Sequence, residues 1–252
     1  MALLQCLYLE GNGNNLDKSI SILIPSKNRP KSLQDLCNSL FDNAENPDKI
    51  EVLVYFDFDD QYLQESLNYF KELNSKYSNS SKVIVGPKLI LSDYPNKLLK
   101  IASSDIFMNL GDDMRCKTPN WDTAIINAMG EYEDKITFVH FDDGYWGPEL
   151  ATHQVIHRKC VECLGYFYPP IFDFGYSDTW MFEVAKKVGR AVYLPILFEH
   201  LHYSLGKSKF DQTYKDKLDS NPNEIYGDLF RATKYLRDVD VQKLKNYIKS
   251  FG

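Results

Sequence analysis

The segment Ile106-Phe-Met-Asn-Leu-Gly-Asp-Asp-Met114 joins a short apolar run directly to two adjacent carboxylates. An apolar run of this length is typical of a buried β-strand. Ligands of open α/β sheets bind outside the carboxyl ends of the strands, and carboxylates are costly to bury unless they are paired or bind a cation. Two interpretations stay open: Asp112 and Asp113 form a divalent-cation site for a phosphate-bearing ligand, or they occupy a solvated turn.

The residues before this segment alternate between strand and helix patterns. Apolar, β-branched runs predict strands at residues 19–24, 51–56 and 82–85. Apolar side chains at helical spacing predict helices over residues 33–41, 63–77 and 96–102. Such alternation predicts a parallel sheet with right-handed crossovers.

The second half is less regular. It carries helical patterns at residues 121–128, near 177–188 and twice after 223, and extended patterns at 136–141, 154–157 and 192–202. We expect one domain over residues 1–215, with halves at about 19–115 and about 116–215. Residues 216–252 are predicted to be a helical extension packed on that domain.

Composition narrows the class of protein. The chain has 252 residues, of which 44% are hydrophobic, enough for a sizeable core. A net charge of −6 with scattered Lys and Arg argues against a nucleic-acid partner. Five cysteines, an odd number in which Cys160 and Cys163 lie three apart but have no second such pair, argue against a disulfide framework or a structural zinc site. The apolar run 1–9 lacks a basic start and a cleavage site, residues 11–15 predict a turn, and no run could span a bilayer. We therefore expect a soluble, cytoplasmic protein.

Polar clusters follow four predicted strands at the same end. They are residues 26–29, 57–60, 112–113 and 199–202. Neither GxGxxG nor GxxxxGK[ST] is present, so a Rossmann dinucleotide site and a P-loop are both disfavoured. A diphosphate would then need a divalent metal, with Lys or Arg, as its counter-charge.

Several motifs occur in a recognisable order. They are Ile24-Pro-Ser-Lys-Asn-Arg-Pro30, Asp57-Phe-Asp-Asp60, Asn96-Lys97, Gly111-Asp-Asp113, Gly175-Tyr-Ser-Asp-Thr-Trp180 and His200-Leu-His202. Over residues 19–215 the chain resembles a GT-A glycosyltransferase of the family-2 type. The resemblance implies an α/β GT-A fold: a Rossmann-like, mostly parallel central sheet flanked by helices, with C-terminal helices. It also implies a metal-dependent, inverting transfer of a sugar from a nucleotide-diphosphate sugar to an acceptor hydroxyl. The half at about 19–115 would bind the nucleotide, and the half at about 116–215 would bind the acceptor.

The resemblance assigns roles to individual positions. The residues implied to bind the nucleotide or the donor sugar are Pro25, Ser26, Arg29, Asp57, Asp59, Asn96, Lys97, Asp112 and Lys207. For Lys207, an ordinary surface lysine is the alternative. Gly111 stands where the family has the first acid of its Asp-x-Asp motif. Asp113 matches the metal-binding acid, and the metal would be Mn²⁺ or Mg²⁺.

His200 and His202 lie two apart on an extended segment, so their side chains should point the same way. Imidazole suits Mn²⁺ alongside oxygen ligands. His202 matches the late metal ligand of such enzymes, while His200 is interpreted as structural. Ordinary core or surface histidines remain the alternative.

Asp178 matches the acid that inverting members use as general base, which would take a proton from the acceptor hydroxyl. A helix N-cap is the alternative, because Ser177-Asp178-Thr179 is good capping chemistry. Aromatic residues gather in the second half and suit sugar rings or an ordinary core. Asp142, Asp143 and Trp146 are candidate acceptor contacts.

Two other functions stay open at this point. A nucleotidyltransferase acting on a sugar phosphate also places acids and a metal around a nucleotide. A carbohydrate- or nucleotide-binding module without catalysis is the other alternative.

Overall fold

The computed structural model describes residues 19–77, 80–208, 215 and 222–251. The apolar run 1–9 and the predicted turn at 11–15 lie outside these residues, as do most residues around the proposed domain boundary at 215. Among the described residues, eight strands form one sheet in the order β3-β2-β1-β4-β7-β6-β8-β5. The strands are β1 (Ile20–Ser26), β2 (Ile50–Asp57), β3 (Ser81–Gly86), β4 (Ile106–Asn109), β5 (Met114–Cys116), β6 (Phe138–Asp142), β7 (Gln154–His157) and β8 (Ala191–His200).

Most of the sheet is parallel. β1 pairs in parallel with β2 and β4, and β2 pairs in parallel with β3. β7 is antiparallel to both β4 and β6, and β5 is antiparallel to β8, which itself runs parallel to β6. The predicted mostly parallel sheet is confirmed, and the carboxyl ends of β1, β2, β4 and β8 meet at one edge.

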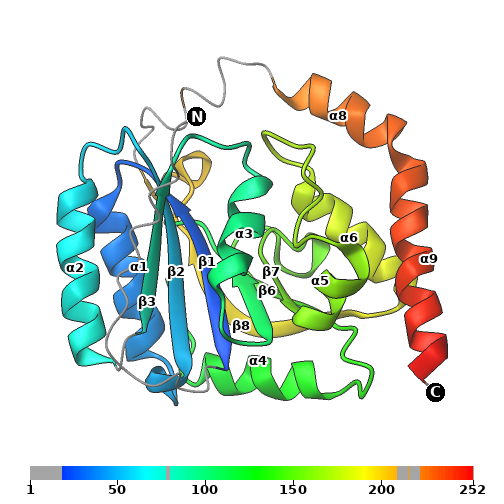
Figure 1. Cartoon of the computed structure of the whole chain (residues 1–252), viewed down its shortest axis with the longest axis horizontal. Helices are drawn as coiled ribbons and strands as arrows, with labels where there is room; N and C mark the ends of the chain where they lie inside the picture. The colour runs from blue at the N-terminus through cyan, green and yellow to red at the C-terminus, as the bar shows by residue number, and fades with distance from the viewer. Residues whose placement is uncertain (1–18, 78–79, 209–214, 216–221, 252) are drawn as a thin grey trace.

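Helices cover both faces of the sheet (Figure 1). They are α1 (Pro30–Asp42), α2 (Leu63–Lys76), α3 (Asp93–Leu98), α4 (Trp121–Gly130), α5 (Arg158–Leu164), α6 (Ser177–Val188), α8 (Pro222–Ala232) and α9 (Lys234–Phe251). Side chains of α1, α2 and α4 share one core with the sheet, and those of α3, α5, α6 and α9 share the other. No helix in the described part of the chain is long and apolar enough to cross a bilayer.

The apolar character of β1 follows from its position between these cores. Ile20, Ile22 and Ile24 face the core beneath α1, while Leu23 faces the opposite core. Strands buried on both faces need near-continuous apolar residues rather than alternation. Pro30 occupies the first turn of α1, where its missing N–H costs no helical hydrogen bond.

The sequence patterns did not predict two elements, α5 and β5. α5 has only seven residues and β5 only three, too few to show a period. The predicted helix at 96–102 begins three residues earlier, at Asp93, and ends in a 3₁₀ turn over Leu99–Ile101. The two C-terminal helical patterns correspond to α8 and α9, and α9 packs against α5 and α6.

A buried carboxylate fixes the amino ends of the central strands. Glu51 is 1% exposed and accepts hydrogen bonds from Ser21 Oγ, from Ser103 N at 2.6 Å and from Ser103 Oγ at 2.7 Å. Lys82 Nζ lies 3.1 Å from Oε2 of Glu51, the oxygen that also accepts from Ser103 Oγ. Burial alone would raise the pKa of Glu51, but these hydrogen bonds and the Lys82 charge outweigh it and lower the pKa. The cluster joins β1, β2 and the loop before β4.

Candidate active site

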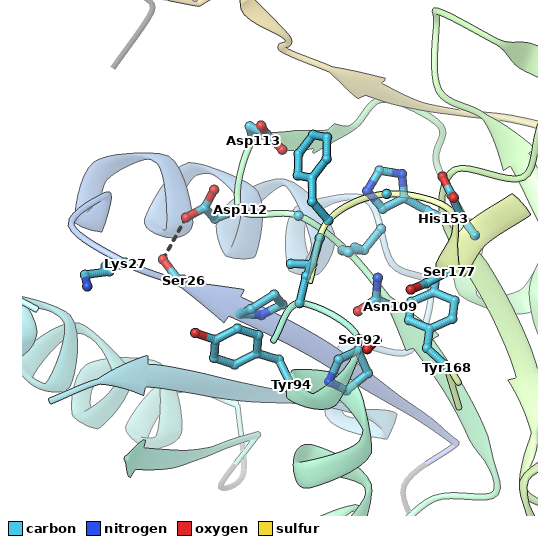
Figure 2. A pocket seen from close by; sticks show the side chains of 18 of the residues that line it. Ser26, Lys27, Ser92, Tyr94, Asn109, Asp112, Asp113, His153, Tyr168 and Ser177 are labelled. Atoms are coloured by element: carbon cyan, nitrogen blue, oxygen red, sulfur yellow. Dashed lines mark hydrogen bonds between the residues drawn. The ribbon is translucent and has the colours of Figure 1, made fainter. Parts of the chain in front are cut away.

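A cavity of about 460 Å³ lies at the carboxyl ends of β1, β2, β4 and β8 (Figure 2). Its position agrees with the strand-end clusters predicted from the sequence. The predicted site residues that line it are Pro25, Ser26, Arg29, Asp57, Asp112, Asp113, Asp178 and His202.

The acid pair lies at the centre of a charged network. Ser26 Oγ donates to Asp112 Oδ2 at 2.8 Å, and Arg29 Nη1 lies 3.1 Å from Asp112 Oδ1 and 3.7 Å from Asp113 Oδ2. Burial, together with the charge of Asp113, raises the pKa of Asp112, while Arg29 opposes the shift. Ser32 Oγ holds the backbone by donating to the Asp112 carbonyl at 2.9 Å. The solvated-turn interpretation does not describe this buried, paired carboxylate.

Gly111 allows the Asp113 carboxylate to fold close to the backbone. A Cβ at position 111 would lie 2.6 Å from Asp113 Oδ1. A side chain at position 111 would therefore require the Asp113 carboxylate to shift.

A second polar group lies at the end of β2. Asp57 is 4% exposed, accepts from the Tyr94 hydroxyl at 2.8 Å and lies 3.3 Å from Lys27 Nζ. Asp60 links the β1 and β2 loops, because its Oδ2 accepts from Asn28 N at 2.8 Å. Asn28 has φ 56°, a left-handed conformation that Asn tolerates better than most residues.

Three histidines lie together in the cavity, and one of them, His200, lies beside Asp113. His200 Nε2 lies 3.5 Å from Asp113 Oδ1, and the His200 ring contacts the rings of His202 and His153 with centroids 5.2 and 5.6 Å apart. All three histidines line the cavity. Burial lowers the pKa of His153 to about 4, so its imidazole is neutral near pH 7. Nδ1 of His202 lies 2.7 Å from Ser204 Oγ, a contact that fixes the ring.

Asp178 is in the first turn of α6 but is not its N-cap residue. The N-cap is Tyr176, whose φ of 57° is left-handed and which makes no side-chain cap. Asp178 Oδ1 accepts from Thr179 N at 2.7 Å, and Gln154 Nε2 donates to the Asp178 carbonyl at 2.8 Å. Burial raises the pKa of Asp178. The carboxylate therefore lines the cavity and helps to satisfy the helix start.

Several predicted contacts do not line the cavity. These are Asp59, Asn96, Lys97, Asp142, Asp143, Trp146 and Lys207. Asp59 pairs with Lys27 at 2.7 Å and Lys207 with Glu199 at 2.9 Å. Asp143 Oδ1 accepts from the backbone N–H groups of the following turn, and its Oδ2 accepts from Thr152 at 2.8 Å. Trp146, on that turn, is 46% exposed. The roles given to these residues stay predictions.

The lining residues that the sequence patterns missed include Ser92, Asn109, His153 and Tyr168. His153 directly precedes β7, and the start of an antiparallel strand meets the carboxyl ends of its parallel neighbours. The strand-end pattern includes only residues at the carboxyl ends of strands, so it did not include a residue at the start of an antiparallel strand. Asn109 ends β4, so it carried a usable signal, whereas Ser92 and Tyr168 lie in irregular segments.

A comparison with protein-family models matches residues 21–211 to the family described as Glycosyl transferase family 2. The chain belongs to glycosyl transferase family 2. The predicted family and the prediction of a glycosyltransferase are thereby confirmed. No curated protein matches this glycosyl transferase.

Solved structures share the fold at low sequence identity. The mannosyltransferase PcManGT from Pyrobaculum calidifontis, in complex with GDP-Man and Mn²⁺, is 12% identical with a TM-score of 0.58, over 94% of this chain and 75% of that one. S. aureus TarS 1-349 in complex with UDP-GlcNAc is 17% identical with a TM-score of 0.54, over 71% and 57%. Glucosyl-3-phosphoglycerate synthase from Mycobacterium tuberculosis, with Mg²⁺ and UDP, is 12% identical with a TM-score of 0.53, over 75% and 74%. The predicted GT-A fold is confirmed.

Proposed function

We propose that this glycosyl transferase moves a sugar from a nucleotide-diphosphate sugar to an acceptor hydroxyl, with a divalent metal and with inversion at the anomeric carbon. One observation carries the proposal: the Asp112–Asp113 pair and Asp178 line the same cavity at the carboxyl ends of the parallel strands. The Asp112–Asp113 pair suits a metal-bound diphosphate, and the Asp178 carboxylate suits proton abstraction from the acceptor.

The residues around Asp113 fit a divalent cation. Within the described part of the chain, no three His, Cys, Asp or Glu side chains are close enough to hold a metal by themselves. Mg²⁺ sites of this kind complete their shell with waters and substrate phosphates. Asp113 and His202 would supply protein ligands, and the metal would neutralise charge that develops on the leaving diphosphate. Structures of similar fold hold Mn²⁺ or Mg²⁺.

Asp178 acts as general base in this proposal. Its carboxylate takes the proton of the acceptor hydroxyl as that oxygen attacks the anomeric carbon. The raised pKa of Asp178 strengthens its proton affinity relative to an exposed carboxylate. A direct displacement needs one such carboxylate, unlike hydrolysis by an acid/base pair.

The nucleotide would lie toward β1 and β2, held by Ser26, Arg29 and Asp57. The acceptor would approach from the side of Trp146, next to Tyr145, whose ring stacks on His202 with centroids 6.4 Å apart. Family membership supports glycosyl transfer over the nucleotidyl transfer that the acids alone left open. The presence of Asp113, Asp178 and His202 around one cavity speaks for a catalyst over a binding module.

The metal-dependent step is tested by calorimetric titration of UDP and of GDP with and without Mn²⁺. Wild-type enzyme should bind one of them more tightly with metal, and Asp113→Ala should lose that gain. Asp238→Ala is the matched control, because Asp238 lies on α9 and pairs with Lys187 at 2.9 Å, away from the cavity. Equal metal-supported affinity in wild type and Asp113→Ala would overturn the proposal.

A further inference from the structure

Three side chains at one end of the cavity carry buried polar atoms that make no hydrogen bond of normal geometry with the described residues, although the Tyr168 hydroxyl lies beside the Asn109 side chain. These atoms are Ser92 Oγ, Asn109 Oδ1 and the Tyr168 hydroxyl. Figure 2 shows the three residues together beside Ser177, away from Lys27. Buried polar atoms are almost always hydrogen-bonded. Three exceptions on one cavity wall indicate that a ligand supplies their partners.

A single amide holds the two loop members of this cluster in place. Asn96 Nδ2 donates to the Tyr168 carbonyl at 2.8 Å and to the Ser92 carbonyl at 3.1 Å, and its Oδ1 accepts from Phe167 N at 2.8 Å. Ser92 N also donates to the Phe172 carbonyl at 3.2 Å. The unpartnered atoms are therefore positioned before a ligand arrives, and preorganised groups bind at lower entropic cost.

The chemistry of the cluster favours a neutral, hydroxyl-rich ligand. Asn109 Oδ1 can only accept a hydrogen bond, while the Ser92 and Tyr168 hydroxyls can donate or accept. Burial and the charge of nearby Asp178 raise the pKa of Tyr168, so this end of the cavity disfavours an anion. Asp112 lies on the other side in Figure 2, where Arg29 pairs with it and a metal-bound diphosphate would lie.

We propose that Ser92, Asn109 and Tyr168 bind the hydroxyl groups of the transferred sugar and thereby select which sugar the enzyme accepts. This inference rests on the proposed function, because it requires a nucleotide sugar in the cavity. Asn96 is a positioning residue in this assignment. It acts through the backbones of Ser92 and Tyr168, rather than by the donor contact that the family resemblance implies.

The test separates sugar binding from nucleotide binding. UDP, GDP, UDP-glucose, UDP-N-acetylglucosamine and GDP-mannose are each titrated with Mn²⁺ into wild type, Tyr168→Phe and Ser92→Ala. Each variant should weaken binding of the preferred nucleotide sugar by about tenfold, the size of one lost hydrogen bond, and leave the bare nucleotide unchanged. Tyr69→Phe is the control, because its hydroxyl bonds Asn38 on the surface at 3.0 Å.

Thermal unfolding without ligand gives an independent readout. The Ser92 hydroxyl has no partner, so Ser92→Ala should leave the midpoint unchanged or raise it. The Tyr168 hydroxyl interacts only with the neighbouring Asn109 side chain, so Tyr168→Phe should change the midpoint little. Asn96→Ala breaks bonds that are present and should lower the midpoint. A fall in Tyr168→Phe and Ser92→Ala equal to that in Asn96→Ala would overturn the assignment in favour of a structural role.

The titrations also distinguish the two proposals. If the variants bind the nucleotide sugar as tightly as wild type, the sugar assignment fails and the proposed function stands. If the variants weaken sugar-bearing and bare nucleotides equally, the cluster holds the nucleotide and the assignment is again wrong. If wild type binds none of the five ligands, both proposals fall.

Discussion

The substitution Asp178→Asn tests the proposed base while keeping the start of α6. Asn presents an oxygen to Thr179 N, which Asp178 Oδ1 accepts from at 2.7 Å, so the hydrogen bond in the first turn of α6 is kept. It cannot take a proton from an acceptor hydroxyl. A positioned base typically contributes about a hundred- to ten-thousandfold in rate. At about 1.4 kcal/mol per factor of ten, the barrier should rise by about 3 to 6 kcal/mol.

The same substitution should not destabilise the enzyme. Burial raises the pKa of Asp178, so between its ordinary value and the raised one the folded state holds a proton that the unfolded state has lost. The free energy of unfolding therefore falls as pH rises through that window, and the penalty persists above it. Asp178→Asn removes this penalty, so at pH 7 its unfolding midpoint should equal or exceed that of wild type. The difference should vanish below about pH 4, where both states of the carboxyl are protonated.

Initial-rate assays with the preferred nucleotide sugar, together with thermal scans at pH 4 and pH 7, check both parts. Donor affinity should change little, since the loss lies in turnover. Asp178→Ala removes the hydrogen bond to Thr179 N as well as the base, so it should match Asp178→Asn in rate and fall below it in stability by about 1 kcal/mol. A fully active Asp178→Asn enzyme, or a product with the donor's anomeric configuration, would leave the helix start as the only role of Asp178.

Three further outcomes are expected. Metal titrations should show that His202→Ala loses Mn²⁺-supported nucleotide binding and His200→Ala keeps it; the opposite result would reverse the ligand assignment, since His200 Nε2 is 3.5 Å from the Asp113 carboxylate. Glu51→Gln should lower the free energy of unfolding at pH 7 by about 2 kcal/mol, measured by urea denaturation. Because the pKa of Glu51 is lowered in the folded state, its contribution is present above the ordinary carboxyl pKa and is lost as pH falls through the folded value, so the loss should shrink in acid. Trp146→Ala should raise KM for the acceptor and leave donor binding unchanged, and equal KM values in steady-state kinetics would remove Trp146 from the acceptor site.

The sequence by itself determined the parallel half of the sheet and its acids. β1, β2, β3 and β4 are visible because burial on both faces demands apolar, β-branched residues over several consecutive positions. Asp57 and Asp112 follow two of these strands, so their place at one edge of the sheet follows from chain direction alone. Apolar periodicity and strand-end chemistry are local properties, and a single chain records them.

Only the tertiary structure decided which other side chains reach the cavity. His153 arrives there because β7 runs against its neighbours, a choice made by strand pairing over long range. Ser92 and Tyr168 meet because one amide, Asn96, bonds two loops about 70 residues apart in the chain. Asp142 and Asp59 follow strands as Asp112 does, yet neither lines the cavity. Spacing along the chain could not distinguish the residues that line the cavity from those that do not. The contacts that decide this join residues far apart in sequence.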